Sequence, residues 1–334
     1  MSSLPSVAVI VVGINSMRWL GPALDSLQRS SGQEEIFTLS LFYVDNNSSD
    51  GSVPFVRERY PTVHVVQNRA NRGFSAANNQ AMRIALDSGT DYVFLVNPDT
   101  YSPAGLIRHL TTFMQERRSY GIVGPLQWQY TLGEPLEPVH NEWTRGAIAA
   151  GERHVLAVNR GCLAPPPDPG TPRAPQTLEH GYVQGAALFA RAEMLRQIGL
   201  LDEVYHSFYE ETELCRRARL AGWRVALVTD CGIHHRGGNG TTSSYRRLLM
   251  MRNKYFFLLT DTDLTVADMI AIIRGWLGRD LSGNGVGGAS TLGQAWLDAA
   301  RSCAWLVSRL PTVIHRRRSL SSLRSADRDL NCRV

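Results

Sequence analysis

Several apolar segments of this chain end abruptly at polar side chains that could do chemistry. In the segment YVFLVNPDT, residues 92–100, an apolar run gives way to Asn97, Pro98 and Asp99. Proline cannot donate a hydrogen bond to a sheet, so a strand must end here. These residue types also form ordinary turns. Ligands of open α/β sheets, however, bind beyond the carboxyl ends of the strands. Asp99 is therefore either a turn residue or a ligand of a metal or a substrate.

Polar residues follow three other predicted strands in the same way. Residues 7–14, 39–44 and 63–67 are short apolar runs typical of strands covered on both faces, and helical patterns alternate with them. This alternation predicts a parallel sheet with right-handed crossovers. The side chains beyond the strand ends should therefore gather along one rim: Asn15, Asp45, Asn47, Asp50, Asn71 and Asp99. Their convergence predicts a nucleotide-type site.

A second acidic group opens a predicted helix over residues 210–221. Glu210, Glu211 and Glu213 stand in its first turn, where the helix dipole stabilises carboxylates. Glu213 can also pair with Arg217 four residues further on.

Two histidines follow a predicted strand over residues 224–228. His234 and His235 precede Arg236 and two glycines. A single histidine is usually structural, but two after a strand and before two glycines are less often so. Beyond residue 245 the pattern becomes helical, over residues 248–259, 266–277 and 292–310.

The composition is that of an ordinary globular chain, long enough at 334 residues for one large domain with an appendage, or for two domains. The net charge is +5, and most of the surplus lies in residues 315–334, where six arginines face two aspartates. Five scattered cysteines without C-x-x-C spacing predict neither disulfides nor a zinc site, and indicate a reducing compartment. The sequence has no signal-peptide pattern and no apolar stretch long enough to span a bilayer, so we expect a cytoplasmic protein.

Eight segments together resemble, in order, a family 2 glycosyltransferase, and more closely the rhamnosyltransferase-like branch that builds bacterial surface polysaccharides. They are VAVIVVGINS, YVDNNSSDGS, NRGFSAANN, YVFLVNPDT, GIVGP, GAALFARAEM, FYEETELCRRARLAGWRV and IHHRGG. The resemblance implies the α/β GT-A fold, with a Rossmann-like nucleotide-binding half and an acceptor half. Residues 1–240 would form this catalytic domain, and residues 241–334 a helical C-terminal extension with a basic tail.

The resemblance also implies a single displacement with inversion, assisted by Mg²⁺ or Mn²⁺ on the departing diphosphate. Asp99 matches the last acid of the family's Asp-x-Asp metal motif, and Asn97 replaces the first acid. His235, or His234 in the alternative register, matches a histidine that approaches the metal. Glu211 matches the catalytic base, with Glu210 and Glu213 as alternatives.

The residues expected to bind the nucleotide-sugar donor are Asn15, Asp45, Asn47, Asp50, Asn71, Gly73, Asn78, Asn79, Asn97 and Gly185. Asp45 resembles the acid that contacts the nucleotide base or ribose. Asn78 and Asn79 could equally cap a helix, and Gly185 could serve close packing. Gly13 and Ile14 stand where the family usually has Thr-Tyr.

The expected activity is transfer of a rhamnose-like sugar from a dTDP-sugar to a saccharide or lipid-linked acceptor. A UDP-hexose donor, and a nucleotide-sugar-binding protein with impaired turnover, are the alternatives. The apolar residues Trp296, Leu297, Trp305, Leu306, Val307 and Leu310, followed by Arg316, Arg317 and Arg318, predict a peripheral contact with the inner face of a membrane. Packing on the catalytic domain, or on a second subunit in a homodimer, would use the same face. No aromatic-basic motif for nucleic acid is present.

Overall fold

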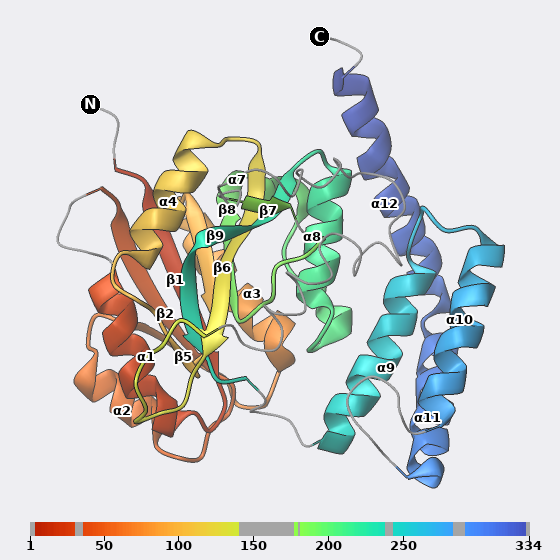
Figure 1. Ribbon diagram of the computed structural model, residues 1–334, viewed down its shortest axis with the longest axis horizontal. Coiled ribbons are helices and arrows are strands. Elements are labelled where there is room, and N and C mark those ends of the chain that lie inside the picture. Colours follow the sequence, from red (N-terminus) through yellow and green to blue (C-terminus); the bar gives the residue numbers. More distant parts are fainter. Residues whose placement is uncertain are drawn as a thin grey trace.

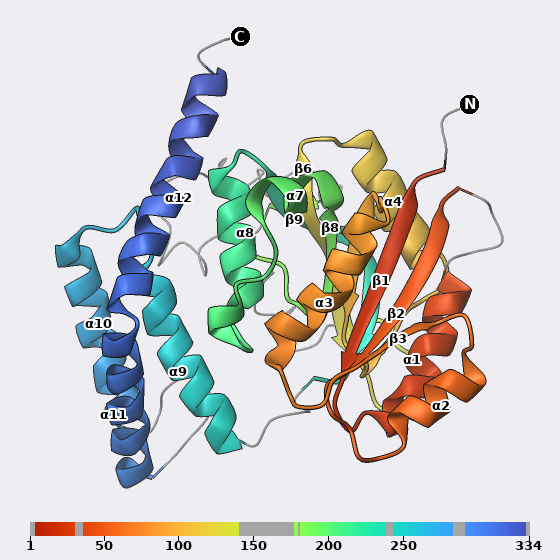
Figure 2. The same ribbon diagram turned by 180° about the vertical axis from the view of Figure 1, so that it is seen from behind.

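A nine-stranded mixed sheet with helices on both faces forms the centre of the protein in this computed structural model (Figures 1 and 2). The structure describes residues 4–30, 36–139, 177–179, 181–237, 243–282 and 291–331. The strands of the path follow the order β3-β2-β1-β4-β8-β6-β9-β5. Most of the candidate site residues lie at or just beyond the ends of the strands, along one edge of this sheet.

The first half of the sheet is parallel, as predicted. It consists of β1 (Ser6–Gly13), β2 (Thr38–Asp45), β3 (His64–Gln67) and β4 (Tyr92–Val96). Each strand lies within one residue of its predicted bounds. Because β1 and β4 are buried on both faces, their sequences are apolar throughout rather than alternating.

Helices cover the two faces in separate sets. On one face, α1 (Met17–Ser30), α2 (Ser52–Arg59) and α4 (Leu106–Glu116) pack their apolar side chains against the sheet. On the other face lie α3 (Gly73–Asp87), α7 (Ala192–Ile198) and α8 (Glu210–Leu220). The helical patterns that alternate with the first strands predicted α1 and α3, and the helix predicted over residues 210–221 is α8; α2 and α4 were not predicted. Ile84 of α3 is 46% exposed.

The second half of the sheet is not parallel throughout. β8 (Ala187–Arg191) runs antiparallel to β4 and to β6 (Tyr120–Gln129), and the short β7 (Thr177–Glu179) pairs with β9 (Arg224–His235). β9 continues seven residues beyond the predicted strand, through an irregularity at which Pro125 pairs with Val228 and Leu126 with Gly232. This extension carries the two histidines to the short strand β5 (Thr100–Tyr101).

Four C-terminal helices stand together beyond α8 (Figures 1 and 2). They are α9 (Ser243–Leu259), α10 (Val266–Leu281), α11 (Leu292–Ser308) and α12 (Leu310–Asn331). Lys254 on α9 pairs with Asp280 on α10 at 2.6 Å, and Arg247 pairs with Asp298 on α11 at 2.9 Å. None of the described helices is both long and apolar enough to cross a membrane.

The sequence pattern did not predict the break between α11 and α12, because both sides of it are apolar. The helix expected over residues 292–310 ends at Ser308, and α12 begins at Leu310 with Pro311 in its first turn. Proline is favoured there because the amide it lacks would have no helical partner.

Candidate active site

Asp99 and His235 face each other where β4 ends. Thr100 pairs with His235 between β5 and β9, and the backbone amide of Arg236 donates to the carbonyl of Asp99 at 3.1 Å. The Nε2 atom of His235 lies 3.5 Å from Oδ1 of Asp99 and 3.4 Å from Nδ2 of Asn97. Asp99 and His235 are both buried. Segments more than a hundred residues apart thus bring the three predicted polar groups to one point.

Gln127 orients the His235 ring. Its Oε1 atom lies 2.9 Å from Nδ1 of His235. An amide oxygen only accepts hydrogen bonds, so Nδ1 carries the proton and Nε2 presents a lone pair towards Asp99. Histidines that bind metals are commonly held in this way by a hydrogen bond to the other ring nitrogen. Gln127 was not predicted; its only signal was a polar residue in an otherwise apolar run, and it is buried.

An imidazole nitrogen and a carboxylate oxygen together fit a divalent ion such as Mn²⁺, and the carboxylate also suits Mg²⁺. The donor set of Asp99 and His235 is therefore compatible with the predicted metal.

His234 does not share this place. Successive side chains of a strand point to opposite faces, and His234 donates from Nδ1 to the carbonyl of Gln129 at 3.1 Å. Its ring packs edge-on against Trp128, with centroids 5.0 Å apart. Burial lowers the pKa of His234. Of the two histidines that the sequence left as alternatives, only His235 faces Asp99.

The loops after β1 and β2 are joined by hydrogen bonds. Asp45 is fully buried and accepts from the amide of Ser48 at 3.0 Å and from the hydroxyl of Tyr43 at 3.2 Å. Asn15 has a left-handed φ of 49°. Its backbone N–H donates to Ser48 Oγ, and its side-chain Oδ1 accepts from the backbone N–H of Ser49, both at 2.9 Å. The two loops therefore form one rigid rim.

Two more predicted residues complete this rim. Asp50 accepts from the amide of Met17 at 2.9 Å, at the start of α1. Asn71 accepts from Asn46 Nδ2 at 2.8 Å and from the amide of Gly73 at 2.9 Å. The side chains of Asn15, Asn47 and Asn71 are exposed along the rim, where a ligand could reach them. Asn46, which the sequence analysis missed, is buried beneath them.

Tyr43 occupies the space beside Gly13. A Cβ at residue 13 would lie 3.0 Å from the Tyr43 hydroxyl and 2.9 Å from Ser16 Oγ. This chain has Gly13 where the family usually has threonine, and the ring of Tyr43 from the neighbouring strand β2 fills the space beside it.

Gly73 at the start of α3 lies against His206. Its φ is +80°, and a Cβ there would lie 2.4 Å from Nδ1 and 2.6 Å from the carbonyl oxygen of His206. The amide of Ser75 donates to that carbonyl at 3.1 Å. His206, Phe208 and Tyr209 themselves have positive φ values of 63°, 70° and 74°. Non-glycine residues rarely adopt this conformation, and here it leads directly into Glu210.

Glu210 and Glu211 hold carboxyl oxygens without partners. Oε2 of each accepts no hydrogen bond from any described residue, and neither does Oε1 of Gln184. Burial raises the pKa of Glu211 to about 7. Burial and the charge of Glu211 raise the pKa of Glu210 well above its usual value. Buried acceptors without partners are rare in native proteins, and hydroxyl groups of a bound saccharide would satisfy them.

Glu213 has a different place. It accepts from Nε of Arg217 at 2.8 Å, and Arg217 also donates to the carbonyl of Leu200. Asn78 donates to the carbonyl of Phe74 at 2.9 Å. Asn79 donates to the carbonyl of Leu201 at 2.9 Å. Asn79 and the Glu213–Arg217 pair therefore join α3 and α8 to residues 200–201, whereas Asn78 bonds within its own helix.

Gly185 connects the metal-binding end to the acidic end. The amide of Asn97 donates to the carbonyl of Ala186 at 3.0 Å. A Cβ at Gly185 would lie 3.3 Å from the Phe74 ring and 3.8 Å from Cβ of Glu211. The Asp99–His235 pair and the first turn of α8 therefore lie on the same side of the sheet, joined through residues 185–187.

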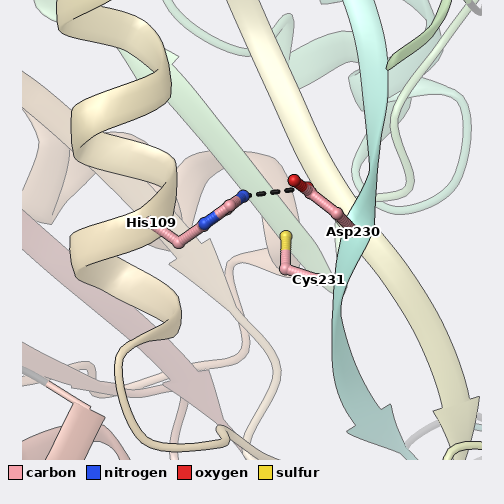
Figure 3. A group of neighbouring side chains, drawn as sticks. All are labelled: His109, Asp230 and Cys231. Atoms are coloured by element: carbon pink, nitrogen blue, oxygen red, sulfur yellow. Dashed lines mark hydrogen bonds and ion pairs between the residues drawn. The ribbon is translucent and has the colours of Figure 1, made fainter. Parts of the chain in front are cut away.

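A second group of potential metal ligands lies elsewhere, between α4 and β9 (Figure 3). The donor atoms of His109, Asp230 and Cys231 lie within 4.8 Å of one another, in a cavity of about 620 Å³ that Arg108 also lines. His109 Nε2 already bonds Asp230 at 2.9 Å, and burial raises the pKa of the Cys231 thiol. A metal ion would have to separate that pair and deprotonate the thiol beside a guanidinium. We therefore assign the group to a hydrogen-bonded pair that joins α4 to β9.

The chain is similar to known proteins over most of its length. The family model described as Glycosyl transferase family 2 matches residues 8–192. The N-acetylglucosaminyl-diphospho-decaprenol L-rhamnosyltransferase of Mycobacterium tuberculosis is 26% identical over 237 residues, which are 65% of this chain and 73% of that protein. The low-salt glycan biosynthesis hexosyltransferase Agl10 of Haloferax volcanii is 29% identical over 177 residues, 53% of this chain and 52% of that one.

Solved structures share the fold. TarS residues 1–349 from S. aureus, in complex with UDP, superpose with a TM-score of 0.53 at 16% identity, covering 98% of this chain and 92% of that one. The mannosyltransferase PcManGT from Pyrobaculum calidifontis, in complex with GDP-Man and Mn²⁺, superposes with a TM-score of 0.56 at 15% identity. The match covers 97% of this chain and 85% of that one. A longer TarS chain from S. aureus also matches, and the match covers 44% of that chain.

Proposed function

Since this chain belongs to glycosyl transferase family 2, we propose which sugar it transfers and between which molecules. It is a glycosyltransferase of polysaccharide biosynthesis. It would move a rhamnose-like sugar, with inversion, from a dTDP-sugar to a saccharide or lipid-linked acceptor. The predicted family and fold class are confirmed. The name of the Mycobacterium tuberculosis relative supports rhamnose and a lipid-linked acceptor. A UDP-hexose is the second candidate donor, favoured by the TarS complex with UDP.

The observation that carries the proposal is the pairing of Asp99 with His235 at the end of β4. These two residues would hold Mg²⁺ or Mn²⁺, with Asn97 facing the same point. A bound ion would neutralise charge on the departing diphosphate. Because Asn97 supplies no negative charge, we expect weak metal binding until a nucleotide adds its phosphate oxygens.

Glu211 is the proposed base. Its carboxylate would take the proton of the acceptor hydroxyl as that oxygen attacks the anomeric carbon and the bond to the diphosphate breaks. A pKa near 7 suits a general base, which must be ionised and still basic enough to hold the proton. Glu210 is buried, and burial together with the charge of Glu211 raises its pKa well above the usual value, so the neutral form, which can donate a hydrogen bond, would be favoured. Glu213 is engaged by Arg217.

The rim formed by the loops after β1, β2 and β3 is the proposed nucleotide site. The side-chain amide of Asn47 and the Nδ2 groups of Asn15 and Asn71, whose Oδ1 atoms already accept bonds within the rim, offer hydrogen bonds to a base and a ribose. Asp45 would support the rim from below and could accept one further hydrogen bond. Gly73 and Gly185 would let the donor approach the backbone closely. We assign this function to residues 1–240, and to residues 241–334 the role of a helical extension.

We also propose that the outer faces of α10 and α11 contact an anionic lipid surface on the inner side of the cell membrane. Large apolar side chains are exposed on these helices: Val266, Ile270, Leu292, Trp296, Leu297 and Val307. Four arginines are exposed near them: Arg274, Arg279, Arg301 and Arg309. Each aspartate among the described side chains of residues 244–323 is buried or half-buried. An apolar face edged by cations fits a negatively charged membrane.

The basic tail contributes less to this face than the sequence indicated. Trp305 is half-buried and packs edge-on against Phe256, with centroids 5.6 Å apart. Arg316 pairs with Asp202 at 2.9 Å, and Arg317 donates to the carbonyl of Leu259 at 3.1 Å. These side chains hold α12 and α11 against the rest of the protein.

Release of nucleoside diphosphate, measured over a panel of dTDP- and UDP-sugars with Mg²⁺ or Mn²⁺, tests the proposed activity. Turnover with a dTDP-linked 6-deoxyhexose and an added saccharide acceptor is the expected result. Tight binding of a nucleotide sugar without turnover for any acceptor would contradict it and favour a binding protein.

A further inference from the structure

The loop that leads into Glu210 is held from a second side by the C-terminal extension. Asn253 of α9 is fully buried. Its Nδ2 atom lies 2.9 Å from the carbonyl oxygen of Tyr205 and 2.8 Å from those of Ser207 and Phe208. One side-chain amide therefore serves three carbonyls of a four-residue segment, and that segment contains two of the three positive-φ residues before α8.

Arg252 fixes the direction of the Asn253 amide. Its Nε donates to Oδ1 of Asn253 at 3.0 Å, so the N–H₂ end must face the loop. Its Nη2 also reaches the carbonyl of Tyr205 at 3.3 Å, and its guanidinium lies over the Trp305 ring, 4.6 Å from the centroid. Asn253 is thus held in a single orientation by α9 and α11 together.

The opposite side of the same loop contacts the start of α3. The amide of Ser75 donates to the carbonyl of His206, and the amide of Phe74 donates to Ser207 Oγ at 3.3 Å. A loop with positive φ values persists only where its surroundings enforce it. Here the surroundings are α3, from the nucleotide-binding half, and Asn253, from the extension.

We infer that Asn253 is a positioning residue for the transfer reaction: it holds residues 205–209 in the conformation that directs Glu211 towards the acceptor. This inference rests on the proposed function, since it takes Glu211 as the base. Without the amide, the carbonyls of Tyr205, Ser207 and Phe208 each lose a donor, and the loop can relax towards ordinary φ values. The first turn of α8 would then shift relative to Gly185 and the donor. A displacement of about 1 Å at a reacting group can cost about a hundredfold in rate.

Two substitutions remove the amide donor in different ways. Asn253→Ala deletes it, and Asn253→Asp keeps the shape and the bond from Arg252 but turns an acceptor towards the three carbonyls. Asp280→Asn is the matched control. It breaks the buried pair with Lys254, the residue next to Asn253 on α9, so it loosens the extension without touching the loop.

Steady-state transfer kinetics and amide hydrogen exchange together decide the inference. In an active wild type, we expect both Asn253 variants to lower kcat by about 10- to 100-fold. The KM for the donor should stay within about threefold of the wild-type value, because no donor contact changes. Exchange should accelerate in residues 205–212. Asp280→Asn should keep kcat near the wild-type value even where it lowers the melting temperature.

Unchanged kcat in both Asn253 variants would overturn the inference, as would an equal loss in Asp280→Asn. An inactive wild type would instead refute the proposed function. In that case hydrogen exchange still decides: acceleration confined to residues 205–212 in Asn253→Asp, and absent in Asp280→Asn, supports a positioning residue, and no acceleration overturns it.

Discussion

His235 presents its Nε2 atom to Oδ1 of Asp99 at a distance of 3.5 Å, although Asp99, in the turn before β5, and His235, at the end of β9, lie far apart in the chain. β5 pairs with the end of β9 and brings them together. The unprotonated nitrogen and the carboxylate then face the same point, next to Asn97. The proposed reaction depends on this pair, and the other predicted groups are arranged around it.

Substitution of Gln127 by Met should weaken metal binding without removing a ligand. Gln127 Oε1 fixes the tautomer of His235, and loss of such a supporting hydrogen bond typically costs about 10- to 100-fold in metal affinity. Calorimetric titration with Mn²⁺ in the presence of dTDP measures this metal affinity. Gln129→Met, on the exposed end of the same strand, is the control, and equal effects of the two substitutions would refute the orienting role.

The rate should depend on pH through Glu211. Burial raises its pKa to about 7, and only the ionised form accepts a proton. We therefore expect kcat/KM to fall about tenfold per pH unit below pH 7. Glu211→Gln should lower kcat by about 10²- to 10⁴-fold and abolish this dependence. A pH profile that is flat from pH 5 to 8 in the wild type would exclude Glu211 as the base.

Glu211 should also make stability depend on pH. Its folded-state pKa lies above the ordinary value of 4.5, so its contribution to stability is fully present below about pH 4.5 and is lost as the pH rises to about 7. Glu211→Gln removes that loss. The melting temperature of the variant should therefore exceed that of the wild type at pH 8, by roughly 2 °C or more, and the gap should shrink towards pH 5.

Gly73→Ala should destabilise the protein more than Gly51→Ala. Both glycines have positive φ, but a Cβ at Gly51 meets nothing within 4 Å, whereas one at Gly73 overlaps His206. We expect a cost of about 1 kcal/mol at Gly51 from the backbone alone. At Gly73 it should be about 3 kcal/mol or more. Urea denaturation measures both, and equal costs would mean that α3 and His206 are not in close contact.

The exposed face of α11 should bind anionic vesicles. The wild-type protein should float with phosphatidylcholine vesicles that contain about a third of phosphatidylglycerol, and the floating fraction should fall as the salt concentration rises. Trp296→Glu combined with Val307→Glu should abolish flotation, and Leu4→Glu, an exposed apolar residue far from α11, should not. If the double substitution instead converts a dimer to a monomer and leaves flotation unchanged, the face is a subunit interface.

The strands of the nucleotide-binding half could be predicted because continuous apolar runs ended at polar turns. The choice between His234 and His235 could not, since it depends on which face of β9 each side chain occupies. Gln127 contacts His235, which is more than a hundred residues away in the sequence, and Asn253 contacts a loop about fifty residues away. No local sequence pattern therefore marks either residue. Asn78, Asn79 and Glu213 stand in matching motifs, yet each is engaged elsewhere: Asn78 within its own helix, Asn79 by Leu201, and Glu213 by Arg217. α2 was missed because it has only eight residues and little amphipathic pattern. α4 was missed although its eleven residues carry a clear apolar face.

The most direct test of the account is the rate of nucleoside diphosphate release from a dTDP-sugar with Mn²⁺ and after its removal by a chelator, in the wild type and in Asp99→Ala. We expect turnover to require the ion and to fall by about a thousandfold in the variant, because a metal contributes several kcal/mol to stabilising transition-state charge. Undiminished release after chelation, or in Asp99→Ala, would contradict the central claim that Asp99 and His235 hold a divalent ion against the leaving diphosphate.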